Sequence, residues 1–141
     1  PFNAYLTQIG LETLHVRMDR HCENAMKLAE HLEKHPHINF VNYPLLKSSP
    51  DYELAKKYLP NGSCGVVSFG VKGGRSAAEA FMKHLKIAAI ETHVADARTC
   101  CLHQLGQSSI FIYTLLNKLL LLLCNDSNTL EELHLTSYLS E

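Results

Sequence analysis

One short polar segment of the sequence combines side-chain types that bind a carboxylate or another anion. It holds His93, Val94, Asp96, Arg98 and Thr99. A guanidinium offers a planar fork of donors that matches a carboxylate, and backbone amides of a tight loop can add to it. By chemistry alone the segment is a candidate anion or carboxylate site. The plainer alternative, which the residue types favour, is that Asp96 and Arg98 pair with each other and brace a turn.

Apolar, β-prone runs flank this segment on both sides. The stretch Ile87–His103 therefore predicts a strand, a tight polar loop and a second strand. Loops carried by rigid sheets are where binding groups usually lie. The other predicted elements of the chain must then support these two strands.

The preceding chain predicts helices that alternate with strands. Apolar residues at three- and four-residue spacing indicate a long helix over Pro1–His35, with Gly10 as a place where it can kink. The further helices are expected over Tyr52–Leu59 and Ser76–Leu85, and the strands over Ile38–Tyr43 and Cys64–Val71. The fold class that follows is α+β, with a long N-terminal helix and a small, mostly antiparallel sheet covered by helices on one face.

Composition excludes several classes of protein. The 13 basic and 14 acidic side chains leave a net charge of -1, so we expect no nucleic-acid partner. An odd number of cysteines, five, is not typical of a secreted disulfide framework. The sequence contains no C-x-x-C pair, so we expect no structural zinc site. We therefore expect a reducing, cytoplasmic setting. The opening residue, Pro1, suggests a piece of something longer.

Two features allow less specific interpretations. His31 and His35 have a spacing that can chelate a metal, but a solvated helix end is the simpler interpretation, and we predict no metal site. The apolar run Ile110–Cys124 is shorter than the roughly 20 residues of a membrane helix and contains Asn117 and Lys118. We expect no membrane partner.

Three stretches carry a resemblance to a known family. The chain resembles the carboxy-terminal part of the Cys/Met-metabolism enzymes that use pyridoxal phosphate (PLP), and within them the O-acetylhomoserine sulfhydrylase branch. The stretches are PFNAYLTQIGLETLHVRMDRHCENAMKLAEHLEKHP, VNYPLLKSSPDYELAKKYLPNGSCGVVSFGVKGG and LKIAAIETHVADARTCCLH.

The resemblance implies a fold, a reaction and a set of partners. It implies the small C-terminal domain of a fold type I PLP enzyme over residues 1–103, including its linking helix. The family's sulfhydrylases replace the acetate of O-acetylhomoserine with sulfide to give homocysteine, and γ-lyases and γ-synthases are related alternatives. The implied partners are PLP, an amino-acid substrate such as O-acetylhomoserine, and further copies in a homo-oligomer. The residues that fall in the substrate-binding loop of the resemblance are His93, Val94, Asp96, Arg98 and Thr99.

The resemblance leaves the chain without catalytic or cofactor-binding residues of its own. No lysine here has the sequence context of the family's cofactor lysine, so we expect the chain alone to be inactive. After His103 the family pattern breaks, and residues 104–141 are expected to be a divergent, apolar, helical tail. Two interpretations stay open: one wall of an enzyme's substrate site, or a non-catalytic remnant that associates with intact subunits. An independent metal- or anion-binding module is a third.

Overall fold

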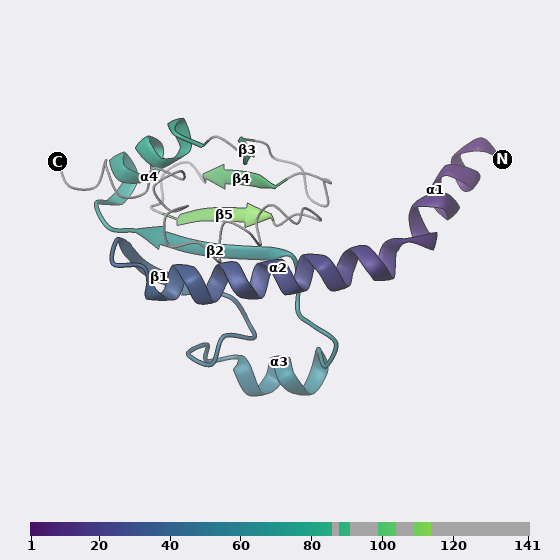
Figure 1. Ribbon diagram of the computed structural model, residues 1–141, viewed down its shortest axis with the longest axis horizontal. Helices are drawn as coiled ribbons and strands as arrows, with labels where there is room; N and C mark the ends of the chain where they lie inside the picture. The colour runs from purple at the N-terminus through teal and green to yellow at the C-terminus, as the bar shows by residue number, and fades with distance from the viewer. Residues whose placement is uncertain (86–87, 91–98, 104–108, 114–141) are drawn as a thin grey trace.

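Four helices and one five-stranded sheet make up the described part of the chain, an α+β architecture as the sequence predicts (Figure 1). The computed structural model describes residues 1–85, 88–90, 99–103 and 109–113. The elements in chain order are α1 (Phe2–Glu12), α2 (Leu14–Lys34), β1 (Ile38–Asn42), α3 (Tyr52–Tyr58), β2 (Val66–Val71), α4 (Gly74–Lys83), β3 (Ala89–Ile90), β4 (Cys100–His103) and β5 (Ser109–Tyr113).

The sheet is mostly antiparallel, in agreement with the prediction. Its strands lie in the order β1-β2-β5-β4-β3. The pairs β1–β2, β2–β5 and β4–β5 are antiparallel, and only the edge pair β3–β4 is parallel. The last described strand, β5, therefore lies in the middle of the sheet.

The core lies between the sheet and the helices α2 and α4. Alternate residues of β2, Val67 and Phe69, point to this face and are fully buried, and Ile110 of β5 lies opposite Phe69. Helix α2 contributes a stripe at helical spacing and α4 contributes a pair one turn apart, all in the same cluster. These helical residues are Ala25, Leu28, Ala29, Leu32, Ala78 and Met82.

The N-terminal helix is broken in two. We expected one long helix that can kink at Gly10, but the break falls at Thr13, whose φ of -105° and ψ of 4° lie outside the helical range. Gly10 stays helical, and its carbonyl accepts a hydrogen bond from Arg17 Nη2 at 2.5 Å. In Figure 1, α1 extends away from the sheet beyond the end of α2.

The strand β5 differs from the sequence expectation. Residues 104–141 were expected to form a helical tail, but Ser109–Tyr113 pair with β2 on one side and β4 on the other. The sequence SIFIY is rich in β-branched and aromatic residues, which favour a strand when both neighbouring positions in the sheet, here β2 and β4, are occupied. The expected domain boundary after residue 103 stays a prediction. Among the described helices, none is long and apolar enough to cross a membrane.

Candidate substrate-side site

The predicted carboxylate-binding segment is described at one residue only. Thr99 belongs to the described part of the chain, whereas His93, Val94, Asp96 and Arg98 lie outside it. The roles expected of these four residues stay predictions. Thr99 is therefore the residue from which the geometry of the site can be built.

Main-chain pairing at the parallel edge of the sheet fixes the position of Thr99. The amide of Ala89 donates to the carbonyl of Thr99 at 2.9 Å. The next residues pair in register, Ala89 with Cys100 and Ile90 with Cys101. Cys100 and Cys101 are fully buried, so the main chain that follows Thr99 is anchored in the core.

The side chain of Thr99 is buried, but its hydroxyl has no hydrogen-bond partner among the described residues. The residue is 2% exposed, and its Oγ1 is buried without a donor or acceptor from that part of the chain. Buried hydroxyls are almost always hydrogen-bonded, because leaving one unpaired costs about 1–3 kcal/mol. The Thr99 hydroxyl is thus placed to donate to, or accept from, a group outside the described residues.

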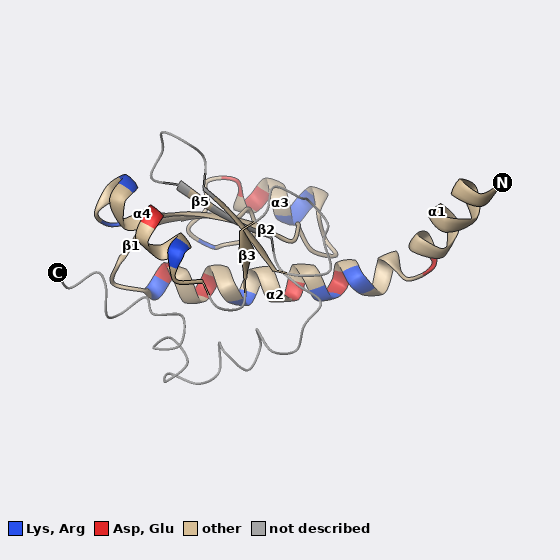
Figure 2. Cartoon of the chain, turned by 90° about the horizontal axis from the view of Figure 1, so that it is seen from above, with Lys and Arg blue, Asp and Glu red and all other residues tan. Residues whose placement is uncertain are grey.

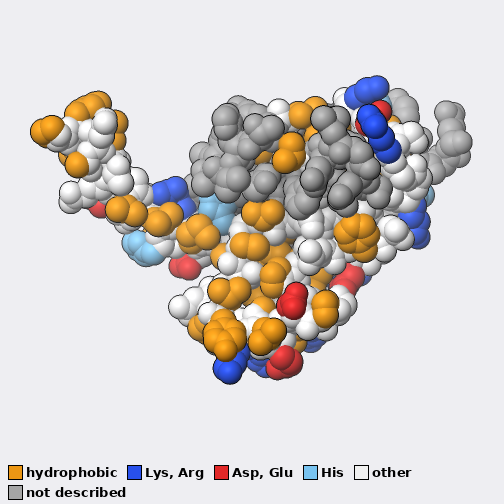
Figure 3. Space-filling view, turned by 180° about the vertical axis from the view of Figure 1, so that it is seen from behind, with side chains coloured by type: hydrophobic (Ala, Val, Ile, Leu, Met, Phe, Trp, Pro, Cys, Tyr) orange, Lys and Arg blue, Asp and Glu red, His pale blue; other side chains and the backbone are white. Residues whose placement is uncertain are grey.

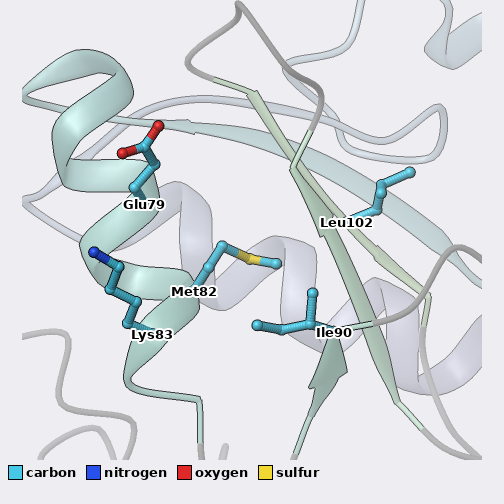
Figure 4. Close-up of a pocket in the computed structure, with 5 residues that line it drawn as sticks. All are labelled: Glu79, Met82, Lys83, Ile90 and Leu102. Carbon is cyan, nitrogen blue, oxygen red and sulfur yellow. The ribbon is translucent and has the colours of Figure 1, made fainter.

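A shallow apolar trough lies beside the same edge of the sheet (Figure 4). Met82 of α4 and Ile90 of β3 point toward each other across it, and Leu102 of β4 lies further along. Glu79 and Lys83 complete the lining, and Glu79 forms an ion pair with Arg75 at 2.7 Å. The volume, about 270 Å³, is below the roughly 300–1,000 Å³ of pockets that enclose a small molecule.

Sequence reasoning did not single out this trough. The signal it could have used is the spacing of Ala78 and Met82, one turn apart on α4, which places Met82 toward the sheet. The positions of Ile90 and Leu102 on the trough depend on strand pairing, which the local sequence does not specify.

The described lysines do not fit the cofactor that the resemblance implies. A lysine that holds PLP as a Schiff base must be in a pocket that also binds the phosphate and the ring nitrogen. Lys27 is instead bonded to Glu23 at 2.9 Å, and Lys56 lies over the ring of Tyr52. All lysines of the described residues are exposed: Lys27, Lys34, Lys47, Lys56, Lys57, Lys72 and Lys83.

The histidines at the end of α2 form a ring cluster. The ring centroids of His31 and His35 are 6.4 Å apart, and those of His35 and His37 are 5.6 Å apart. Burial lowers the pKa of His31, with a smaller effect of Lys34, and burial also lowers the pKa of His35, with smaller effects of the other two histidines. Within residues 1–85, 88–90, 99–103 and 109–113, no three His, Cys, Asp or Glu come close enough together to hold a metal ion.

A second surface feature is the apolar arm, which we define as α1 and the first part of α2, residues 2–18. No residue of α1 is buried, and its one charged residue is Glu12, whereas charged residues are spread along α2 (Figure 2). The space-filling view shows hydrophobic side chains gathered on this arm (Figure 3). The exposed large apolar residues of the arm are Phe2, Tyr5, Leu6, Ile9, Leu11, Leu14, Val16 and Met18.

Comparisons with known proteins place these features in a family. Residues 1–112 match the family described as Cys/Met metabolism PLP-dependent enzyme. A homocysteine synthase of Schizosaccharomyces pombe is 50% identical over 99 residues, which are 70% of this chain and 23% of that protein. An L-methionine gamma-lyase of Treponema denticola is 46% identical over 104 residues, 73% of this chain and 25% of that protein.

A solved structure shares the fold as well. The crystal structure of an O-acetylhomoserine (thiol)-lyase from Campylobacter jejuni, which contains N'-pyridoxyl-lysine-5'-monophosphate, superposes with a TM-score of 0.83 at 31% identity. The superposition covers 94% of this chain and 32% of that one. The chain thus spans about a quarter of the length of the curated relatives it matches.

Proposed function

This chain belongs to the Cys/Met metabolism PLP-dependent enzyme family, and from that premise we propose that it forms one wall of the substrate site in an O-acetylhomoserine sulfhydrylase-like enzyme. In the proposed reaction, sulfide replaces the acetate of O-acetylhomoserine to give homocysteine. The observation that carries the proposal is the buried Thr99 hydroxyl, which has no partner in the described chain. It lies in the segment that the family resemblance assigns to substrate binding.

The chemical task proposed for this wall is to bind and orient the amino-acid substrate. We propose that Thr99 donates its hydroxyl proton to a carboxylate oxygen of the substrate, and that Arg98 adds a forked pair of donors. His93, Val94 and Asp96 complete the proposed loop. No described residue is proposed to act on the cofactor, because the described lysines are exposed.

The proposed domain is the small C-terminal domain of such an enzyme. It contains residues 1–103 together with strand β5 (Ser109–Tyr113), which lies in the middle of the same sheet, and the proposed divergent tail follows β5. We propose that the protein lies in the cytoplasm and assembles as a homo-oligomer. The apolar arm supports an assembly of this kind, because α1 has no buried residue and needs a partner surface to cover it.

Adding PLP to the purified chain tests whether the cofactor lysine lies elsewhere. We expect this chain to show no absorbance band of an aldimine. The intact Schizosaccharomyces pombe homocysteine synthase, treated in parallel, is the positive control and should show the band. A band that borohydride abolishes and peptide mapping assigns to a lysine of this chain would refute the proposed division of roles.

The exposed arm favours a second function, a non-catalytic subunit that associates with intact enzymes. Co-expression with the intact Schizosaccharomyces pombe homocysteine synthase tests this directly, by co-purification through a tag on the shorter chain. The double variant Leu6→Ser/Ile9→Ser should abolish co-purification. The control Leu54→Ser, at an exposed apolar residue on α3, should not.

The activity of the mixed assembly separates the two functions. If the chain forms a working wall of the substrate site, Thr99→Val should raise the KM for O-acetylhomoserine in the mixed assembly. If the chain is a non-catalytic subunit, Thr99→Val should leave the KM unchanged although co-purification persists.

A further inference from the structure

Two cysteines from distant parts of the sequence lie near each other, one on α2 and one in the loop before β2. Cys22 lies on α2, and Cys64 lies two residues before β2 begins. Both thiols are free and partly exposed, whereas Cys100 and Cys101 are buried. Among the cysteines of the described residues, Cys22 and Cys64 are therefore the accessible ones.

A buried tyrosine holds the two main chains together. Tyr43, which follows β1, is fully buried, and its hydroxyl donates to the carbonyl oxygen of Cys64 at 3.0 Å. The carbonyl oxygen of Cys22 lies 3.5 Å from the same hydroxyl. Because one hydroxyl reaches both carbonyls, the main chains of the two cysteines lie close together. Close approach of the two main chains is the first requirement for a disulfide.

The loop also contacts the side chain of Cys22 directly. Gly62 has a φ of +122°, which glycine adopts without strain. A Cβ added to Gly62 would lie 2.9 Å from Cys22 Cβ and 3.1 Å from Cys22 Sγ. The segment that carries Cys64 is therefore packed against the sulfur of Cys22.

The electrostatics agree with two neighbouring thiols. Burial raises the pKa of Cys22, and the nearby Cys64 and Asp19 raise it further. The thiol of Cys64 donates to the carbonyl of Val66 at 3.4 Å. The raised pKa favours the protonated thiol of Cys22, so a peroxide oxidises this group slowly.

We infer that Cys22 and Cys64 form a reversible dithiol–disulfide pair that a peroxide closes. One sulfur attacks the peroxide, the O–O bond breaks, and a sulfenic acid and water are formed. The second sulfur then attacks the sulfenic sulfur, the S–O bond breaks, and a second water leaves as the S–S bond forms. The two thiols lose two electrons, the peroxide gains them, and a small dithiol reverses the change. The new bond ties α2 to the loop before β2.

Peptide mapping of the full chain after hydrogen peroxide treatment tests this inference. The background is Cys124→Ser, which removes the cysteine that lies outside the described residues. We expect an intramolecular Cys22–Cys64 peptide as the main product, and Cys100 and Cys101 should stay reduced. Dithiothreitol should restore both thiols, and the oxidised chain should unfold at a higher temperature than the reduced one.

Single and paired variants give the controls. Cys22→Ser and Cys64→Ser should each abolish the linked peptide and the rise in unfolding temperature. The double variant Ser63→Cys/Cys64→Ser keeps the number of thiols and moves one of them by a single residue, so its linkage should be at least tenfold slower. Oxidation of the wild-type pair to sulfinic acids without a link, or equal linkage in the shifted variant, would overturn the inference.

Discussion

Replacing Thr99 by valine should stabilise the isolated chain. Valine has the shape of threonine, so the buried site stays filled, but a methyl group replaces a hydroxyl that has no partner in the described part of the chain. An unpaired buried hydroxyl costs about 1–3 kcal/mol. We therefore expect Thr99→Val to raise the free energy of unfolding by about 1 kcal/mol, at the lower end of that range because a relaxed side chain recovers part of the cost.

The matched control is Thr99→Ser, which keeps the hydroxyl and removes the methyl group. Losing one buried methyl costs about 1 kcal/mol, so this variant should be less stable than the parent by that amount. Urea unfolding followed by circular dichroism measures both variants. With a urea m-value of about 2 kcal/mol/M, each change moves the midpoint by about 0.5 M, in opposite directions.

The opposite ranking would refute the reasoning. If Thr99→Val lost about 1 kcal/mol or more while Thr99→Ser was neutral, the hydroxyl would already be paired inside the chain. It would then have no reason to bind a substrate. The proposed wall of the substrate site would lose the observation that carries it.

Three further substitutions probe the core and the histidine cluster. Tyr43→Phe removes the hydrogen bond to the carbonyl of Cys64 and should lower the free energy of unfolding in urea by about 1 kcal/mol. Phe69→Ala removes a fully buried ring and should cost about 3–5 kcal/mol in thermal unfolding, and a cost under about 1 kcal/mol would contradict its place in the core. Burial lowers the folded-state pKa values of His31 and His35, so the unfolded chain binds these protons more readily. Their contribution to the free energy of unfolding should be fully present above about pH 6.5 and should be lost as the pH drops through the lower folded-state pKa values. In a pH series of urea unfolding, His31→Gln should make this decline less steep.

The sequence predicted the elements whose pattern is local. The alternation in β2 and the helical stripe on α2 each identify their own element, because one face of each is apolar. The helix α3 begins at Tyr52, as the sequence predicts, after a turn in which the amide of Asp51 donates to Ser49 Oγ at 3.3 Å.

The rest depends on contacts between distant residues. After Ser109, the run IFIY in β5 has no polar residue to reveal a period, and such a run fits a buried strand or a buried helix equally well until its neighbours are known. The break at Thr13 has no strong local signal, since the nearby glycine stays helical. The unpaired hydroxyl of Thr99 and the approach of Cys64 to Cys22 arise only when the sheet is assembled.

The central position of β5 has a consequence for the order of events during synthesis. The ribosome delivers β1 and β2 early, but β2 keeps an unpaired edge until residues 109–113 have emerged. Until then β4 has only the two-residue strand β3 beside it. An unpaired, apolar strand edge is a site for aggregation and chaperone binding. We therefore expect nascent chains that stop at residue 103 to be held by chaperones, and stable folding to begin only after β5 has left the exit tunnel.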